Sequence, residues 1–164
     1  MRNFIDDTSE SWAVVLMLLS GALLFAALLM EHLLDMAPCP LCLMQRIWIF
    51  VAGAFAYVSL LHSPRWGIYP FCSLAAACVG GGFSIRQLYL QSLPADQVPA
   101  CGPDMAYMLD VFPLSEVLLA MTRGTGDCAD PGASVFGLTL AAWALLGFIA
   151  IIVAAVLQFR AGSR

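Results

Sequence analysis

Four of the six cysteines in this chain lie outside its apolar segments and form two candidate redox pairs. Cys39 and Cys42 have the Cys-x-x-Cys spacing and stand at the start of an apolar run. Cys101 and Cys128 lie farther along, within one long polar connection. Neighbouring cysteines exchange disulfides when the thiolate of one attacks the disulfide of another. The pattern therefore predicts thiol–disulfide chemistry beside a hydrophobic segment.

The elements that must position these cysteines are long apolar runs. The chain is 62% hydrophobic and 11% charged, whereas soluble domains carry about 25% charged residues. The runs cover approximately residues 12–30, 43–61, 66–85 and 135–159. A membrane-spanning helix needs roughly 17–25 such residues. We therefore predict an all-α membrane protein, a four-helix transmembrane bundle that forms a single domain over residues 1–164.

The arginines predict the orientation of this bundle, because the chain has no lysine. One side of the bundle receives Arg2, Arg65, Arg160 and Arg164. The positive-inside rule assigns that side to the cytoplasm, together with both termini. The loops at approximately 31–42 and 86–134 then face outward, where disulfides form and persist. The net charge of −4 argues against nucleic-acid binding, which favours clustered Lys and Arg.

The first pair stands at the mouth of the second run, in the order Pro38-Cys39-Pro40-Leu41-Cys42. Proline is tolerated in a first helical turn, so we expect the helix to begin within this motif. The positive end of the helix dipole favours thiolate over thiol. Arg46 follows one turn after Cys42 and brings a permanent cation to the same face. Such a cation can lower the pKa of the dithiol and hold the oxygen of an electron acceptor. An arginine at this position can also reach lipid headgroups instead.

The second pair has two interpretations. A structural bond between Cys101 and Cys128 would staple the loop and stabilise it by roughly 3–4 kcal/mol. Exposed, mobile backbone that a partner protein can reach is instead predicted by Pro99 and Gly102-Pro103 around Cys101 and by Gly124-Thr125-Gly126 before Cys128. Between them, residues 114–121 are typical of a short amphipathic helix parallel to the membrane surface. A zinc site built from all four cysteines is disfavoured, because the second pair lacks the Cys-x-x-Cys spacing, and no metal is predicted.

The third run contains the other two cysteines, Cys72 and Cys78. Cysteines in apolar surroundings are usually inert, and we interpret both as structural. Gly80, Gly81 and Gly82 follow in the same run and predict close helix packing.

In these features the chain resembles the DsbB family of disulfide bond formation proteins along nearly its whole length. The resemblance rests on the Pro-Cys-Pro-Leu-Cys motif with Arg46, on the four apolar runs, and on the loop pair Cys101 and Cys128. It extends to Gly126-Asp127-Cys128-Ala129 and to the stretch from Phe136-Gly137-Leu138 to Trp143.

The resemblance implies a protein-disulfide:quinone oxidoreductase of the bacterial inner membrane, with its cysteine loops in the periplasm. A DsbA-like thioredoxin-fold partner would attack the Cys101–Cys128 disulfide and form a transient mixed disulfide with Cys101. Electrons would then pass to Cys39 and Cys42. Cys42, next to Arg46, would reduce ubiquinone or menaquinone from the membrane pool. Some family members carry a histidine early in the long outward loop. This chain has none there, so Arg46 is the one quinone contact predicted.

Two other functions fit the residues. A reductase of the vitamin K epoxide type also combines Cys-x-x-Cys with four helices, but its motif is expected near a later helix. A disulfide-stapled membrane scaffold would need no chemistry at all. Exchange between the two pairs also allows a cross-link between Cys42 and Cys101.

Overall fold

The computed structural model describes residues 2–34, 38–62, 67–94, 96–103, 105–131 and 134–162. Its long helices are α1 (Arg2–Leu34), α2 (Pro40–His62), α3 (Ile68–Gln91) and α6 (Leu140–Gly162). All four are long and apolar enough to cross a membrane. The prediction of an all-α protein with four membrane spans is thereby confirmed.

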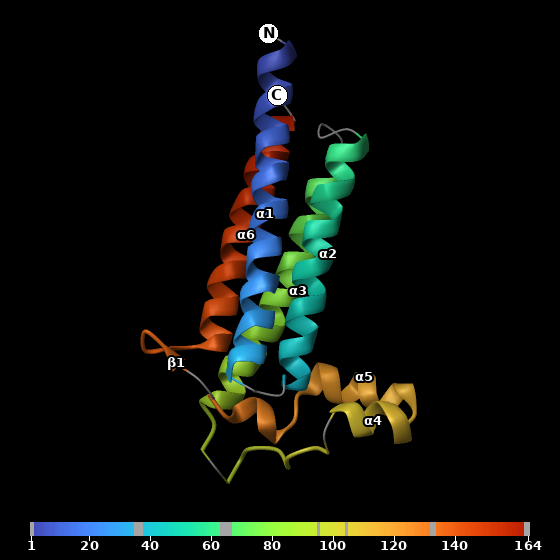
Figure 1. Cartoon of the computed structure of the whole chain (residues 1–164), viewed down its shortest axis with the longest axis vertical. Coiled ribbons are helices and arrows are strands. Elements are labelled where there is room, and N and C mark those ends of the chain that lie inside the picture. Colours follow the sequence, from blue (N-terminus) through green and yellow to red (C-terminus); the bar gives the residue numbers. More distant parts are fainter. Residues whose placement is uncertain are drawn as a thin grey trace.

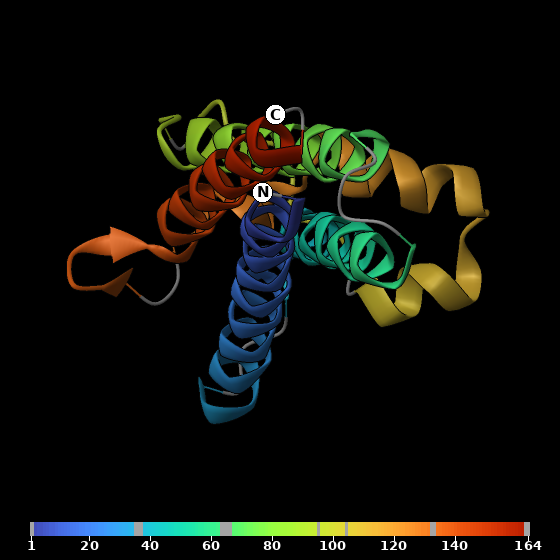
Figure 2. The same cartoon turned by 90° about the horizontal axis from the view of Figure 1, so that it is seen from above.

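The four long helices pack as a ring in which α1 contacts α2 and α6, and α3 contacts the same two helices. Figure 1 shows both termini at one end of this bundle and the long connection between α3 and α6 at the other. Seen from above, α1 crosses the other helices obliquely, and its C-terminal end lies well outside them (Figure 2). The cysteine loops therefore share one end of the molecule, opposite the termini.

Small residues let the helices approach closely inside the ring. The core consists largely of alanines packed around a few larger side chains: Leu16, Ile49, Ala52, Ala56, Ala76, Ala77, Phe148, Ile151, Ala154 and Ala155. A methyl group at Gly80 would overlap the ring of Phe148, so this glycine is required for contact between α3 and α6. At Gly82, by contrast, an added methyl group would meet none of the described residues within 4 Å. Close packing was therefore predicted correctly for Gly80 but not for Gly82.

The connection from α3 to α6 carries short elements that lie across the end of the bundle (Figure 1). They are α4 (Met105–Val111), α5 (Leu114–Arg123), the 3-10 helix η1 (Gly126–Ala129), and strands β1 (Ser134–Val135) and β2 (Leu138–Thr139). Helix α5 occupies the segment where a short helix was expected, whereas α4 was not anticipated. The position of α5 on a membrane surface stays a prediction.

Helix α1 extends beyond its apolar run at both ends, α2 begins before its run, and the boundaries of the other two helices also differ from the prediction. Helix α3 continues to Gln91, so Arg86 and Gln87 belong to a helix and not to the outward loop. Helix α6 begins at Leu140, because β1 and β2 first pair as an antiparallel hairpin. The turn of this hairpin places Phe136 and Gly137 at φ 52° and 79°, a left-handed conformation that no helix accommodates.

Candidate functional site

Cys39 immediately precedes α2. The backbone N–H of Leu43 donates to the Cys39 carbonyl at 3.1 Å, and the backbone N–H of Cys42 donates to the Cys39 sulfur at 3.3 Å. Cys39 thus takes the place of an N-cap residue, with its sulfur serving as the side-chain acceptor. Pro40 follows at the first helical position, where no N–H is needed. The expectation that the helix begins within the motif is confirmed.

Cys128 reaches the same helix end from η1. Its side chain is fully buried in a cluster with Leu41 and Leu90, and Cys39 packs against this cluster. Two glycines allow the approach. A methyl group at Gly124 would lie 2.8 Å from the Leu41 side chain, and one at Gly126 would overlap the carbonyl of Pro99. The glycines near Cys128 therefore serve close packing, and the expectation of exposed backbone just before Cys128 is wrong.

Hydrogen bonding shifts the pKa values of Cys39 and Cys128 in opposite directions. A hydrogen bond from the Cys39 thiol, together with backbone N–H groups at Leu41 and Thr125, lowers the pKa of Cys128 to about 6 despite its burial. The same contact with Cys128 raises the pKa of Cys39, and further increases come from Cys42 and from burial. These opposite shifts in pKa favour a thiolate at Cys128 and a neutral thiol at Cys39.

Two buried glutamines complete the surroundings of the Cys-x-x-Cys motif. The side-chain amide of Gln87, on α3, donates to the Cys42 sulfur at 3.3 Å and to the Cys39 sulfur at 3.5 Å. Its oxygen accepts from the Gln45 amide at 2.8 Å. Gln45 and Gln87 are 5% and 4% exposed. The sequence had not identified Gln87, because the apolar run appeared to end before it.

Arg46 turns toward α1. Its guanidinium forms an ion pair with Glu31 and donates to the carbonyl oxygen of Ala27 at 3.3 Å. Within the described part of the chain, no hydrogen bond joins the guanidinium to a cysteine sulfur. Arg46 is about one-fifth exposed, so its N–H groups remain within reach of a ligand between α1 and α2. The effect of the Arg46 charge on the dithiol, which the sequence suggested, stays a prediction.

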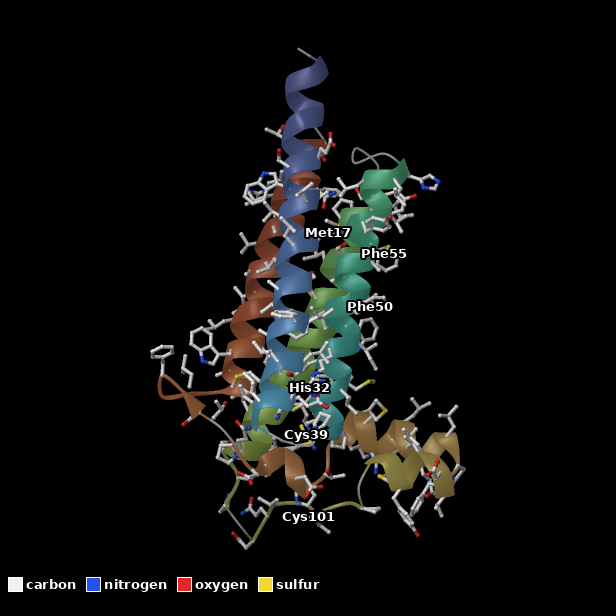
Figure 3. The ribbon with its side chains drawn as sticks, viewed as in Figure 1. Met17, His32, Cys39, Phe50, Phe55 and Cys101 are labelled. Carbon is white, nitrogen blue, oxygen red and sulfur yellow. The ribbon has the colours of Figure 1, made fainter. Side chains whose placement is uncertain are left out.

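Cys101 stands apart from the other three cysteines of the predicted site. It is exposed, in an extended segment beyond the end of the bundle (Figure 3). The carboxylate of Asp127 raises the pKa of Cys101 through a hydrogen bond and through its charge. A hydrogen bond of 3.1 Å from the Gly126 N–H to the Ala100 carbonyl holds this segment near η1. All six cysteines are free thiols in this structure, so the predicted Cys101–Cys128 pair is not joined.

The structure thus brings together Cys39, Cys42 and Cys128, and it leaves Cys101 at the surface. The intramembrane Cys72 and Cys78 lie elsewhere on α3, half-buried and exposed respectively. The Cys39 sulfur contacts both the Cys42 and the Cys128 sulfur, and a sulfur between two others can pass a disulfide from one pair to the next.

Comparisons with known proteins agree with this chemistry. The family model described as "Disulfide bond formation protein DsbB" matches residues 9–158. A disulfide bond formation protein B from Saccharophagus degradans is 42% identical over 139 residues, which cover 83% of this chain and 84% of that protein. The corresponding protein of Marinobacter nauticus is 45% identical over 139 residues, 83% of each chain.

A third relative, from Stutzerimonas stutzeri, is 39% identical over 148 residues, 88% of this chain and 91% of its own. No solved structure matches the chain. The family match spans all four long helices and the connections that carry the cysteines. The chain therefore belongs to the DsbB family of disulfide bond formation proteins and is a multi-pass membrane protein with an oxidoreductase role in disulfide formation.

Proposed function

We propose that this protein reoxidises a DsbA-like thioredoxin-fold protein of the periplasm and delivers the electrons to a membrane quinone. The route runs from Cys101 and Cys128 to Cys39 and Cys42. The observation that carries the proposal is the position of Cys39, which contacts the Cys128 sulfur and accepts a hydrogen bond from Cys42. A sulfur placed between two others is where a disulfide can change partners.

The first step begins at the exposed Cys101. With Cys101 and Cys128 joined, a thiolate of the reduced partner attacks the Cys101 sulfur and forms a mixed disulfide, and Cys128 leaves as a thiolate. The second partner thiol then resolves this bond, so the partner regains its disulfide and Cys101 becomes a thiol. Exposure of Cys101 supports its role as the attacked sulfur. The low pKa of Cys128 supports its role as the leaving group, since thiols of lower pKa leave faster.

The second step transfers the disulfide between the pairs. The Cys128 thiolate attacks Cys39 of the Cys39–Cys42 disulfide, and Cys42 leaves with the bonding electrons. Cys101 then attacks Cys128 and restores the Cys101–Cys128 bond, while Cys39 becomes a thiol. The packing of Cys39 against Cys128 supports this pairing over a cross-link between Cys42 and Cys101.

The third step returns Cys39 and Cys42 to a disulfide. Oxidation of one dithiol releases two electrons and two protons, and a quinone bound here would supply the acceptor for both. Arg46 lies one helical turn from Cys42 and can donate hydrogen bonds to a carbonyl oxygen of such a ligand. Exposed apolar side chains on both helices, among them Leu28 of α1 and Ile47 of α2, are suited to a lipid-soluble molecule. Ubiquinone and menaquinone both have this chemistry.

The proposed location is the bacterial inner membrane, with both termini in the cytoplasm and the cysteine loops in the periplasm. The placement of the termini opposite the cysteines supports this orientation (Figure 1). The electron route also separates this proposal from a stapled scaffold. A scaffold gains nothing from a thiolate that packs against the Cys-x-x-Cys motif.

Anaerobic stopped-flow kinetics test the proposal. Purified protein is mixed with a reduced DsbA-like partner and ubiquinone, and the quinone absorbance is followed. We expect quinone loss that requires the partner and disappears in Cys39→Ser. Cys78→Ser, which changes an exposed thiol on the outer face of α3, is the matched control and should retain the parent rate. Reoxidation of the partner at the parent rate by Cys39→Ser would refute the route and favour the scaffold.

A further inference from the structure

Gln87 is the one polar side chain from α3 that contacts both sulfurs of the Cys-x-x-Cys motif within the described residues. Its amide nitrogen donates to Cys42 at 3.3 Å and to Cys39 at 3.5 Å. Its oxygen also lies 3.7 Å from the Cys42 sulfur. The contact with the nitrogen is shorter, so the amide mainly presents its donor side to the cysteines.

The neighbouring Gln45 fixes this orientation. Its amide N–H donates to the Gln87 oxygen at 2.8 Å, which directs the Gln87 NH₂ group toward the sulfurs. Both glutamines are almost fully buried. Burying a polar amide is costly unless it is paired. The hydrogen bond between the two amides lowers the cost of burying them. It uses the oxygen of Gln87, so both N–H donors of Gln87 are available to the sulfurs.

We propose that Gln87 donates a hydrogen bond that stabilises the negative charge on Cys42 when the Cys39–Cys42 pair is reduced. An amide donor has no charge of its own to titrate, so it acts equally at every physiological pH. A donor aimed at an anion stabilises it more than it stabilises the neutral thiol. Gln45 acts through Gln87 by holding the amide in place.

This inference deepens the proposed function, because Cys42 is the cysteine that faces the electron acceptor in that route. A purely structural role is the alternative, since polar side chains also join helices within membranes. The two differ in what they predict for thiol reactivity. A helix-joining glutamine affects stability alone, whereas a donor to sulfur also changes the thiolate population of Cys42.

Iodoacetamide alkylation of the reduced full-length protein tests the proposal without partner or quinone. Mass spectrometry quantifies the reaction at Cys42. At neutral pH we expect Gln87→Leu to lower the alkylation rate roughly ten-fold, the effect of losing a hydrogen bond to a charged group. In strongly alkaline solution, where every thiol is ionised, the rates of variant and parent should converge. Convergence separates a change in thiolate population from a change in reagent access.

A buried glutamine at the far end of the bundle supplies the matched control. Gln158 on α6 donates to the Ser59 hydroxyl of α2 at 3.0 Å and is fully buried. Gln158→Leu removes an interhelical hydrogen bond far from the cysteines and should leave the alkylation rate within about two-fold of the parent. Gln45→Leu should give a partial loss, because the Gln87 amide then loses its orientation.

An unchanged alkylation rate in a folded Gln87→Leu protein would overturn the proposal. If Gln87→Leu does not fold, the near-isosteric Gln87→Glu decides the question. It replaces the donor with a carboxylate, so it should slow alkylation at neutral pH at least as much, and an unchanged rate there would equally overturn it. A changed rate in a protein that fails to reduce quinone would leave the role of Gln87 intact and refute the proposed function alone.

Discussion

Cys128 is expected to be a thiolate at neutral pH, and a pH titration of the reduced protein measures this directly. Hydrogen bonds from the Cys39 thiol and from two backbone N–H groups lower its pKa to about 6. An ordinary cysteine has a pKa of about 8.5. At pH 7 these values correspond to roughly 90% and 3% thiolate. The structure therefore predicts a nucleophile about thirty-fold more abundant than an unperturbed cysteine would supply.

The largest cause of this shift can be removed by mutation. Cys39→Ala deletes the thiol that donates to Cys128, while the backbone donors at Leu41 and Thr125 remain. The pKa of Cys128 should then rise, but not all the way to the ordinary value. At pH 7 the thiolate fraction of Cys128 should fall several-fold. Cys78→Ala, on the outer face of α3, should leave the titration unchanged.

The ultraviolet absorbance of the thiolate is the suitable readout, because Cys128 is buried and alkylating reagents reach it poorly. Subtracting the titration of Cys128→Ser from that of the parent isolates the contribution of Cys128. We expect a midpoint near pH 6. Lowering the pH through this midpoint protonates the nucleophile. The rate of exchange with Cys39 should therefore be independent of pH above the midpoint and should fall below it. A midpoint near the ordinary cysteine value, or one that Cys39→Ala does not move, would refute the reasoning.

Two other perturbations test different parts of the site. Arg46→Ala should raise the apparent KM for quinone several-fold and leave the rate of exchange with the reduced partner unchanged, and unaltered quinone kinetics would remove Arg46 from the site. Gly126→Ala should lower the free energy of unfolding by about 1–3 kcal/mol, measured by thermal unfolding. The added methyl group would lie 2.9 Å from the Cys101 amide nitrogen and would overlap the Pro99 carbonyl. The control is Gly82→Ala, whose methyl group would have none of the described residues within 4 Å. Equal stability of the two variants would contradict the close contact between Gly126 and the Cys101 segment.

The architecture was largely predictable because each span is a long uncharged run, and hydrophobic length is a strong signal in a membrane protein. The limits of the runs were less reliable. Hydropathy responds to Phe136 and Leu138 as it does to helical residues, so it could not detect the hairpin before α6. It also ended α3 too early, because Arg86 and Gln87 are polar, although they continue the helix.

The candidate site was predictable in part. Cys39 and Cys42 were identified from their spacing and Cys128 from its place in the loop, but the spacing could not show which sulfurs meet. The contact between Cys39 and Cys128 depends on Leu41, Leu90 and the glycines before η1, which pack across three separate segments. Such contacts arise only when the chain folds, so a linear pattern cannot reveal them.

The first turn of α2 explains why disulfide exchange would take place at this point in the chain. The backbone N–H of Leu41 donates to the Cys128 sulfur, and that of Cys42 donates to the Cys39 sulfur. Pro40 has no N–H, so it adds no unpaired donor to this turn. In the proposed route, attack by Cys128 on Cys39 would displace Cys42, and the negative charge would move from one sulfur at this helix end to another. The Leu41 N–H would therefore stabilise the charge on Cys128 before the transfer, and the helix dipole together with the Gln87 amide would stabilise it on Cys42 afterwards.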